Sequence, residues 1–196
     1  MKKKFIDPLI KRKAELTKKI QFYKKNIPLP SVIEISESGT CNRTCSFCPR
    51  SAPDYKDIKD FISDKLIIKL SKQLSVYDYS GIFLFSGFVE PLIDKNIFNL
   101  LSIVKKNLPK AKIEMVTNGD VLDEEKTKKL FQSGLSTLLV SIYDGKKEAD
   151  DMENLLKRSG LKEDQFKVRH RYLSENESFG ITLSNRSGMM ENAEYS

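Results

Sequence analysis

The sequence has few of the residues that build disulfide scaffolds, membrane spans and histidine-containing metal sites. It has three cysteines and one histidine in 196 residues, and the cysteines all lie between Cys41 and Cys48. An odd number of cysteines on one short segment does not suit a disulfide framework and indicates a metal or cluster site in a reducing compartment. The absence of a long apolar run argues against a membrane-spanning helix. The opening MKKK is not followed by the apolar segment of a secretory signal, so we expect a cytoplasmic protein.

Several catalytic patterns are also missing. The chain has no Ser/His/Asp arrangement, no Walker-type phosphate loop and no Gly-x-Gly-x-x-Gly motif, so other nucleotide chemistries lack support. Positive charge is in excess, with 34 Lys and Arg against 27 Asp and Glu and a net charge of +7. Such an excess can serve an acidic partner such as nucleic acid or an anionic metabolite. Because no basic stripe with interleaved aromatics accompanies it, we favour a solvated Lys-rich surface and keep nucleic acid as the less favoured partner.

The composition suits one domain with short appendages. Hydrophobic residues make up 39% of the chain, which is enough for one core. We expect a basic N-terminal helix and linker at residues 1–30, a core domain at 31–173 and a polar segment at 174–196. The abrupt polar end of the sequence favours a missing C-terminal portion.

The N-terminal segment has apolar residues at roughly helical spacing. This spacing predicts an amphipathic helix from about Pro8 to Lys25, ended by Pro28 and Pro30. We expect the helix to pack on the main domain. Binding to a membrane surface or to nucleic acid is the weaker alternative.

Strand-like and helix-like segments then alternate. The predicted strands are SVIEISES (31–38), GIFLFSG (81–87), KIEMVTNG (112–119), TLLVSIY (137–143) and FKVRHRYL (166–173), and the predicted helices are 64–74, 95–108, 123–132 and 147–158. Such alternation with short connections predicts βα units and a parallel sheet, hence an α/β fold. Periodicity alone does not choose between an open doubly wound sheet and an incomplete barrel.

The cysteines form a Cys-x3-Cys-x2-Cys motif directly after the first predicted strand. The motif comprises Cys41, Cys45 and Cys48, with Phe47 before the last cysteine. Three thiolates on one loop can bind three irons of a [4Fe–4S] cubane, and no fourth cysteine exists to bind the fourth iron. A zinc site would need another ligand, and the single histidine, His170, lies far along the chain. Three unrelated buried cysteines are the other alternative.

This motif resembles the cluster signature of the radical S-adenosylmethionine (SAM) superfamily. Three further segments, at the ends of successive predicted strands, are similar to that family's motifs. They are Ser86-Gly87-Phe88-Val89-Glu90-Pro91, similar to a Gly-Gly-Glu-Pro motif that holds the SAM amino group, Thr117-Asn118-Gly119, and Ser141 in VSIYDG. The resemblance implies a partial (β/α) TIM-like barrel. Val89 stands where the family has glycine, so we expect extended backbone there.

Alternation along the strands predicts which side chains face the interior of the barrel. Ile33 and Ile35 would face the helices, leaving Glu34 and Ser36 inward. Glu114, Val116 and Asn118 would share one face of their strand, and Leu139, Ser141 and Tyr143 one face of theirs. On the last strand, Lys167, Arg169 and Arg171 would point inward, and Arg169 or Arg171 could pair with the SAM carboxylate or an anionic substrate. In the opposite register, His170 and Tyr172 would point inward instead.

The resemblance also implies a chemistry. The cluster and SAM, reduced by a flavodoxin- or ferredoxin-type donor, would produce a 5′-deoxyadenosyl radical that abstracts hydrogen from a peptide or small metabolite. Cys41, Cys45 and Cys48 would hold the cluster. Phe47, Gly87, Phe88, Val89, Glu90, Asn118, Ser141, Arg169 and Arg171 would form the SAM site. An RNA-modifying enzyme and a non-catalytic Fe–S-binding fragment are the alternatives. Asn185–Met189 resembles a segment that precedes the cysteine-rich SPASM domain in some relatives, but no cysteine follows Cys48.

Overall fold

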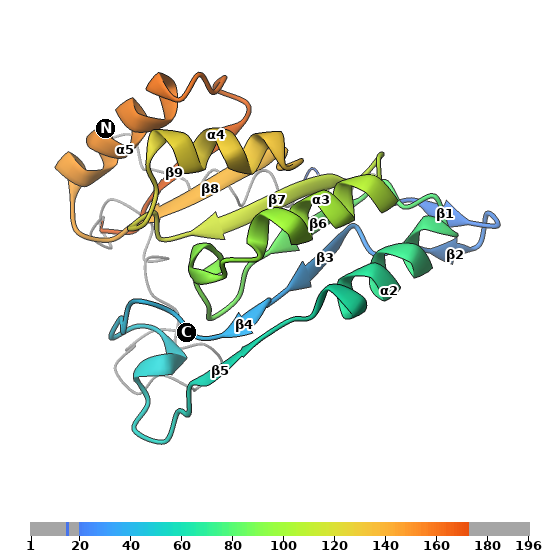
Figure 1. The fold of residues 1–196 in the computed structure, drawn as a ribbon, viewed down its shortest axis with the longest axis horizontal. Coiled ribbons are helices and arrows are strands. Elements are labelled where there is room, and N and C mark those ends of the chain that lie inside the picture. Colours follow the sequence, from blue (N-terminus) through green and yellow to red (C-terminus); the bar gives the residue numbers. More distant parts are fainter. Residues whose placement is uncertain (1–14, 16–19, 173–196) are drawn as a thin grey trace, which may run out of the picture.

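A parallel sheet forms the centre of the chain in a computed structural model that describes Glu15 and residues 20–172 (Figure 1). Its five strands, in hydrogen-bonded order, are β3 (Val32–Ile35), β6 (Ile82–Phe85), β7 (Lys112–Thr117), β8 (Thr137–Ile142) and β9 (Phe166–His170). All four neighbouring pairs are parallel. The spatial order follows the chain order without the reversal that marks a doubly wound sheet. The sheet is therefore part of a (β/α) barrel, as predicted.

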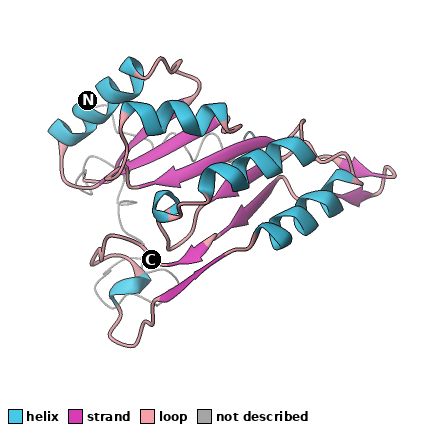
Figure 2. Ribbon diagram, viewed as in Figure 1, coloured by secondary structure: helices cyan, strands magenta, loops and turns pink. Residues whose placement is uncertain are grey.

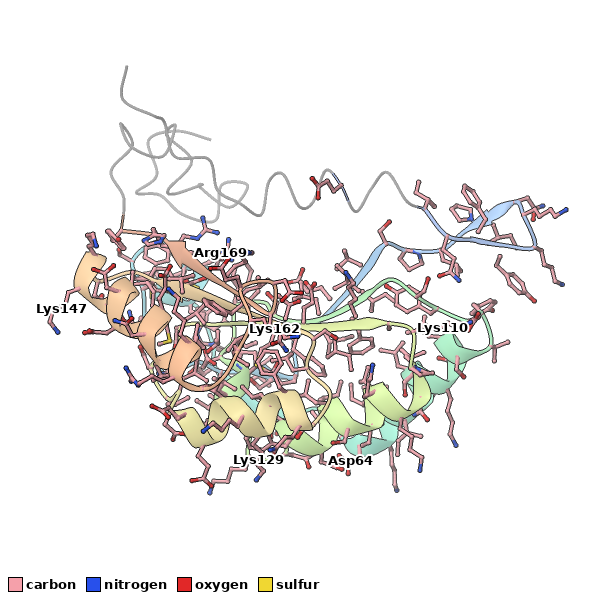
Figure 3. The ribbon with its side chains drawn as sticks, turned by 90° about the horizontal axis from the view of Figure 1, so that it is seen from above. Asp64, Lys110, Lys129, Lys147, Lys162 and Arg169 are labelled. Atoms are coloured by element: carbon pink, nitrogen blue, oxygen red, sulfur yellow. The ribbon has the colours of Figure 1, made fainter. Side chains whose placement is uncertain are left out.

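Helices cover one face of this sheet (Figures 2 and 3). They are α2 (Asp64–Ser75), α3 (Ile97–Asn107), α4 (Glu124–Gln132) and α5 (Lys146–Arg158). The Ser63 hydroxyl caps α2 by accepting the Leu66 N–H, and the Asp123 carboxylate caps α4 by accepting the Lys126 N–H. These segments agree with the predicted helices to within two residues at each end.

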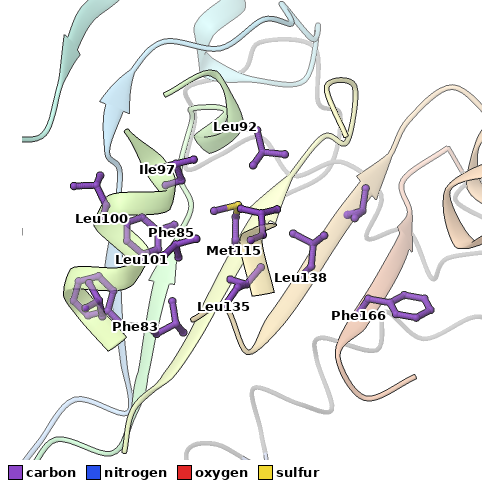
Figure 4. Packing of buried hydrophobic residues seen from close by; sticks show 14 of the residues in the cluster. Phe83, Phe85, Leu92, Ile97, Leu100, Leu101, Met115, Leu135, Leu138 and Phe166 are labelled. Carbon is purple, nitrogen blue, oxygen red and sulfur yellow. The ribbon is translucent and has the colours of Figure 1, made fainter. Parts of the chain in front are cut away.

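The apolar core lies between the sheet and the helices (Figure 4). Alternate side chains of the three central strands are buried in it, namely Phe83, Phe85, Ile113, Met115, Leu138, Val140 and Ile142. Helix α3 adds Leu100, Leu101 and Val104, which are fully buried. Phe166 and Val168 of β9 join the same core, so Arg169 has the opposite orientation, and Figure 3 shows it on the side of the sheet away from the helices. The predicted register of β9 is confirmed.

The N-terminal helix prediction is wrong at its C-terminal end. Residues 8–14 and 16–19 lie outside the described residues, and Glu15 is helical. The following residues form a hairpin of β1 (Phe22–Tyr23) and β2 (Ile27–Pro28). Lys24 and Lys25 have positive φ, which makes the turn and ends any helix. The Tyr23 ring also packs edge-on against Tyr77, with 4.8 Å between centroids.

The first predicted strand is two strands. β3 ends at Ile35, and β4 (Ser38–Gly39) pairs antiparallel with β5 (Ile58–Phe61), which the sequence pattern did not indicate. The Ile62 N–H donates to the Glu37 carbonyl, 2.7 Å, and extends this hairpin. The cysteine motif lies between β4 and β5, so the hairpin holds both ends of its loop.

The last strand is shorter than predicted. β9 ends at His170 rather than at Leu173, and the predicted polar segment at 174–196 lies outside the described residues. In the part of the chain that is described, no helix has the length and apolar character needed to span a bilayer.

Candidate functional site

A pocket lies where β6, β7 and β8 end, at the carboxyl edge of the sheet. Parallel α/β folds place their binding sites at this edge. Nine of the predicted site residues line it, namely Cys41, Cys45, Phe47, Cys48, Gly87, Phe88, Val89, Glu90 and Asn118. Five residues outside the predicted site set line it as well: Arg43, Arg50, Val116, Thr117 and Tyr143. Of these, Thr117 belongs to the Thr-Asn-Gly motif, and Val116 and Tyr143 lie on strand faces that the sequence predicted to point inward. Ser141, Arg169 and Arg171 are not among the lining residues.

The cysteine loop turns back on itself through short-range hydrogen bonds. The Cys48 N–H donates to the Cys45 carbonyl, 2.9 Å, and the Ser51 N–H and hydroxyl both donate to the Cys48 carbonyl. Ser51 belongs to the 3-10 helix η1 (Pro49–Ser51). The three cysteines form no disulfide and are half-buried. The loop therefore presents three thiols to one pocket.

The described residues do not form a single-ion site around these thiols. Among the described residues, no group of three His, Cys, Asp or Glu side chains surrounds a point where one metal ion could sit. A cubane takes its thiolates at separate iron corners, so it does not require them to converge on one point. His170 contacts Tyr172, with 2.8 Å between Nδ1 and Oη, and does not line the pocket. The zinc alternative therefore lacks its fourth ligand in this part of the chain.

Burial raises the pKa of the Cys41 and Cys45 thiols above the ordinary value. The charge of Arg50 acts in the opposite direction on Cys41, and that of Arg43 does so on Cys45. Both thiols are therefore protonated at neutral pH in the metal-free chain. Metal binding must displace these protons.

Glu90 joins the ends of β6 and β7. Its carboxylate accepts hydrogen bonds from the Leu92 N–H, the Thr117 hydroxyl and the Asn118 N–H at 3.0, 2.6 and 2.8 Å. The side chain is 1% exposed, and burial raises its pKa. Three protein donors thus already hydrogen-bond to the Glu90 carboxylate, which the family resemblance implies would bind the SAM amino group. A carboxylate has about four acceptor sites, so capacity for a further donor remains.

Gly87 follows β6 and lies against Ser36, the residue after the end of β3. Its φ is +132°, and a Cβ there would lie 2.1 Å from the Ser36 hydroxyl oxygen. The positive φ favours glycine, and any larger residue would also have to displace the Ser36 hydroxyl. Among the described residues other than glycine, positive φ occurs at Lys24, Lys25 and Asp78 and not at Val89, so valine is compatible with the backbone there.

Asn118 connects β7 to the cysteine loop. Its Nδ2 donates to the Asn42 side-chain oxygen at 2.7 Å and lies 3.9 Å from the Cys41 sulfur. Its Oδ1 accepts the Asp120 N–H at 3.0 Å. The Thr-Asn-Gly turn is therefore hydrogen-bonded to the cysteine loop through the Asn118 side chain.

Arg43 links the middle of the cysteine loop to the ends of β7 and β8 through ion pairs. Its guanidinium makes a bidentate ion pair with Asp120, including an Nε to Oδ2 hydrogen bond of 2.7 Å. Nη2 also lies 2.9 Å from Asp144 and 3.4 Å from Glu148. Three carboxylates surround this one cation, and the Asp120 hydrogen bond is the main reason that the pKa of Arg43 is raised.

Arg50 fastens the other end of the loop. Nη1 donates to the Gly39 carbonyl at 2.7 Å and the Phe88 carbonyl at 3.4 Å, and Nη2 pairs with Asp57 at 2.6 Å. The Arg50 side chain is 5% exposed. One buried cation therefore joins β4, the cysteine loop and the segment after β6.

An aromatic pair closes the pocket on the β8 side. Phe47 stacks on Tyr143, with centroids 5.1 Å apart and ring planes 28° apart. The Arg43 guanidinium lies 5.7 Å from the Tyr143 centroid. Burial raises the pKa of Tyr143, so its hydroxyl is protonated at neutral pH.

The remaining predicted residues lie beside the pocket, on the face of the sheet away from the helices. Ser141 is 2% exposed and lies opposite Arg169 in the β8–β9 register. Arg169 Nη1 approaches the Ser141 hydroxyl at 3.5 Å. Arg171 follows β9, and its charge lowers the pKa of Tyr143 against the larger effect of burial.

Comparison with known proteins identifies similar chains. A family model described as the radical SAM superfamily matches residues 35–183. S-adenosyl-L-methionine-dependent 2-deoxy-scyllo-inosamine dehydrogenase from Niallia circulans is 30% identical over 167 residues, which are 83% of this chain and 61% of that protein. This chain thus spans about three fifths of that curated relative.

Solved structures show the same likeness. The crystal structure of BtrN in complex with AdoMet and 2-DOIA has a TM-score of 0.68 and 29% identity, covering 84% of this chain and 63% of BtrN. Native anSMEcpe with bound AdoMet has a TM-score of 0.54 and 20% identity over 70% of this chain and 42% of its own, and this likeness concerns the fold alone.

Proposed function

Because the chain belongs to the radical SAM superfamily, we propose that it forms the cofactor-binding core of a radical SAM enzyme. The cofactors of this superfamily are a [4Fe–4S] cluster and SAM. When bound, they supply a 5′-deoxyadenosyl radical that abstracts a hydrogen atom from the substrate. The observation that carries the proposal is that three free cysteines of one loop line the same pocket as Gly87, Glu90 and Asn118.

In this proposal each part of the pocket has its own task. Cys41, Cys45 and Cys48 bind three irons and leave the fourth without a protein ligand. The segment from Gly87 to Glu90 binds the SAM amino group. Phe47, Asn118 and Ser141 contact its adenosyl part, and Arg169 or Arg171 pairs with a carboxylate of SAM or of the substrate. The residues concerned all lie within 31–173, the proposed core domain.

We further propose a small polar molecule as the substrate. The curated relative is named as a dehydrogenase of 2-deoxy-scyllo-inosamine, and its similarity covers 83% of this chain. The non-helical face of the sheet beside the pocket carries Ser141 and Arg169, which offer a hydroxyl and a guanidinium to polar groups. A peptide substrate is the alternative. The electron donor in either case is of the flavodoxin or ferredoxin class.

Anaerobic reconstitution with iron and sulfide, followed by reduction with dithionite in the presence of SAM, tests the proposal. Release of 5′-deoxyadenosine is expected from the wild-type chain and at background level from Cys41→Ala. Ser46→Ala, an exposed change on the same loop, should behave as wild type. Equal release from wild type and Cys41→Ala, or no iron uptake by the wild type, would overturn the proposal.

A further inference from the structure

Arg50 has one hydrogen-bond donor without a protein acceptor. Both terminal nitrogens of its guanidinium are engaged, Nη1 with two carbonyls and Nη2 with Asp57. Its Nε is buried and has no hydrogen-bond partner among the described residues. Arg50 also lines the pocket of the three thiols. The unpaired donor therefore belongs to a side chain of the cofactor pocket.

A buried unpaired N–H of a charged group costs free energy and calls for a partner. Arginine does not lose its proton at any physiological pH, so the donor cannot be removed by titration. Rotation is opposed as well, because Gly39, Phe88 and Asp57 hold the guanidinium on separate segments. An acceptor that enters the pocket would remove the cost.

The positive charge of Arg50 lies in the same pocket as the three thiols. Its ion-pair partner, Asp57, has a side chain that is 41% exposed, so solvent screens the carboxylate more than the guanidinium. Arg43 differs, because Asp120, Asp144 and Glu148 surround its charge. Of the two arginines that line the pocket, Arg50 is therefore the one whose positive charge is less neutralised by neighbouring carboxylates.

We propose that Arg50 donates its Nε–H to a sulfur of the cluster bound by Cys41, Cys45 and Cys48, and that it raises the reduction potential of that cluster. The inference rests on the proposed function. One-electron reduction adds negative charge to the cluster, and a buried cation with an N–H···S hydrogen bond favours the more negative state. Hydrogen bonds to the sulfurs and local charge are among the established determinants of Fe–S potentials.

The test is the midpoint potential of the reconstituted full chain without SAM, measured by dithionite titration followed by electron paramagnetic resonance. Arg50→Gln should lower the equilibrium constant for reduction about tenfold, which is about 59 mV toward more negative potential. Asp57→Asn removes the opposing carboxylate and should shift the potential the other way. Arg158→Gln removes a cross-helix ion pair with Glu124 and should leave the potential unchanged.

Each outcome decides the inference. An unchanged potential in Arg50→Gln, at normal iron content, overturns it. A weaker SAM affinity in Arg50→Gln with an unchanged SAM-free potential would assign the donor to the SAM carboxylate and also overturn it. If Arg50→Gln takes up no iron, the Asp57→Asn variant provides the test. The inference then fails if the midpoint potential of the cluster in Asp57→Asn is not higher than in the wild type. If the wild type takes up no iron, the proposed function itself fails.

Discussion

Glu37 is a buried carboxylate directly before β4, and burial has the largest effect on its pKa. The side chain is 1% exposed, and its Oε2 has no hydrogen-bond partner among the described residues. Burial, assisted by the charges of Glu90 and Asp94, raises its pKa to about 7. The folded chain therefore keeps a proton that the unfolded chain loses above its ordinary pKa of 4.5.

This raised pKa predicts that stability falls as pH rises from 4.5 to 7. The sign follows because the folded state binds more protons than the unfolded state in this range, so the free energy of unfolding decreases with pH. The loss is about 3 kcal/mol at 1.36 kcal/mol per pKa unit. Glu37→Gln should flatten this part of the profile in urea unfolding at pH 5, 6, 7 and 8. A profile as steep as that of the wild type would contradict the assignment.

Replacement of Gly87 should damage the proposed SAM site. Gly87→Ala places a side chain at positive φ and against the Ser36 hydroxyl, so we expect the segment that precedes Glu90 to be strained. We expect at least tenfold weaker SAM binding by the reconstituted chain. Gly160→Ala is the matched control, because it has φ +83° and no neighbour within 4 Å. It should cost about 1–2 kcal/mol of stability and leave SAM affinity unchanged. Equal SAM affinities in Gly87→Ala and Gly160→Ala would contradict the claim that SAM binding requires glycine at position 87.

At the scale of elements, the Arg43–Asp120 pair ties the cysteine loop to the end of β7. Asp120→Asn keeps an acceptor for Asn42, which is 2.9 Å away, but removes the ion pair with Arg43. A half-buried bidentate pair of this kind contributes about 2 kcal/mol. Urea unfolding of the metal-free chain should show that loss.

The control for this pair is Glu124→Gln, which breaks an exposed ion pair to Arg158 between α4 and α5. Exposed pairs contribute about 0.2–1 kcal/mol, so the change should be small. A double-mutant cycle with Arg43→Gln and Asp120→Asn then isolates the coupling. A coupling near zero would show that the loop is held by its other contacts.

The elements that the sequence predicts well are those with long periodic signals. Apolar runs such as GIFLFSG predict strands that are covered by helices. Alternation in FKVRH predicts that Val168 faces the core and that Arg169 faces the other side of the sheet. The β4–β5 hairpin has two residues in one of its strands, too few for a periodic signal, and pairing across the cysteine loop decides it. Arg43 and Asp120 are 77 positions apart, and no local pattern relates them. Arg50 and Tyr143 adjoin recognisable motifs, yet their contacts come from the folded loop.

At the scale of the whole molecule, one edge of the sheet carries the chemistry and one face carries the core. The helices and the sheet bury the apolar side chains, while the carboxyl ends of β6, β7 and β8 meet the cysteine loop. Stability and cofactor binding therefore depend largely on different residues. Leu101→Ala, in the core, should cost about 2–5 kcal/mol in urea unfolding and leave the cysteine loop intact. Loss of iron binding in that variant under folding conditions would contradict this separation.

The most direct test of the account is the electron paramagnetic resonance spectrum of the reduced, reconstituted chain with and without SAM. In the proposed site, three protein thiolates leave one iron for SAM, so adding SAM should change the g values of the wild-type cluster. Gly87→Ala should need a higher SAM concentration for the same change. A spectrum that stays identical at saturating SAM would contradict the claim that the cysteine loop and the Gly87–Glu90 segment together form one cofactor site.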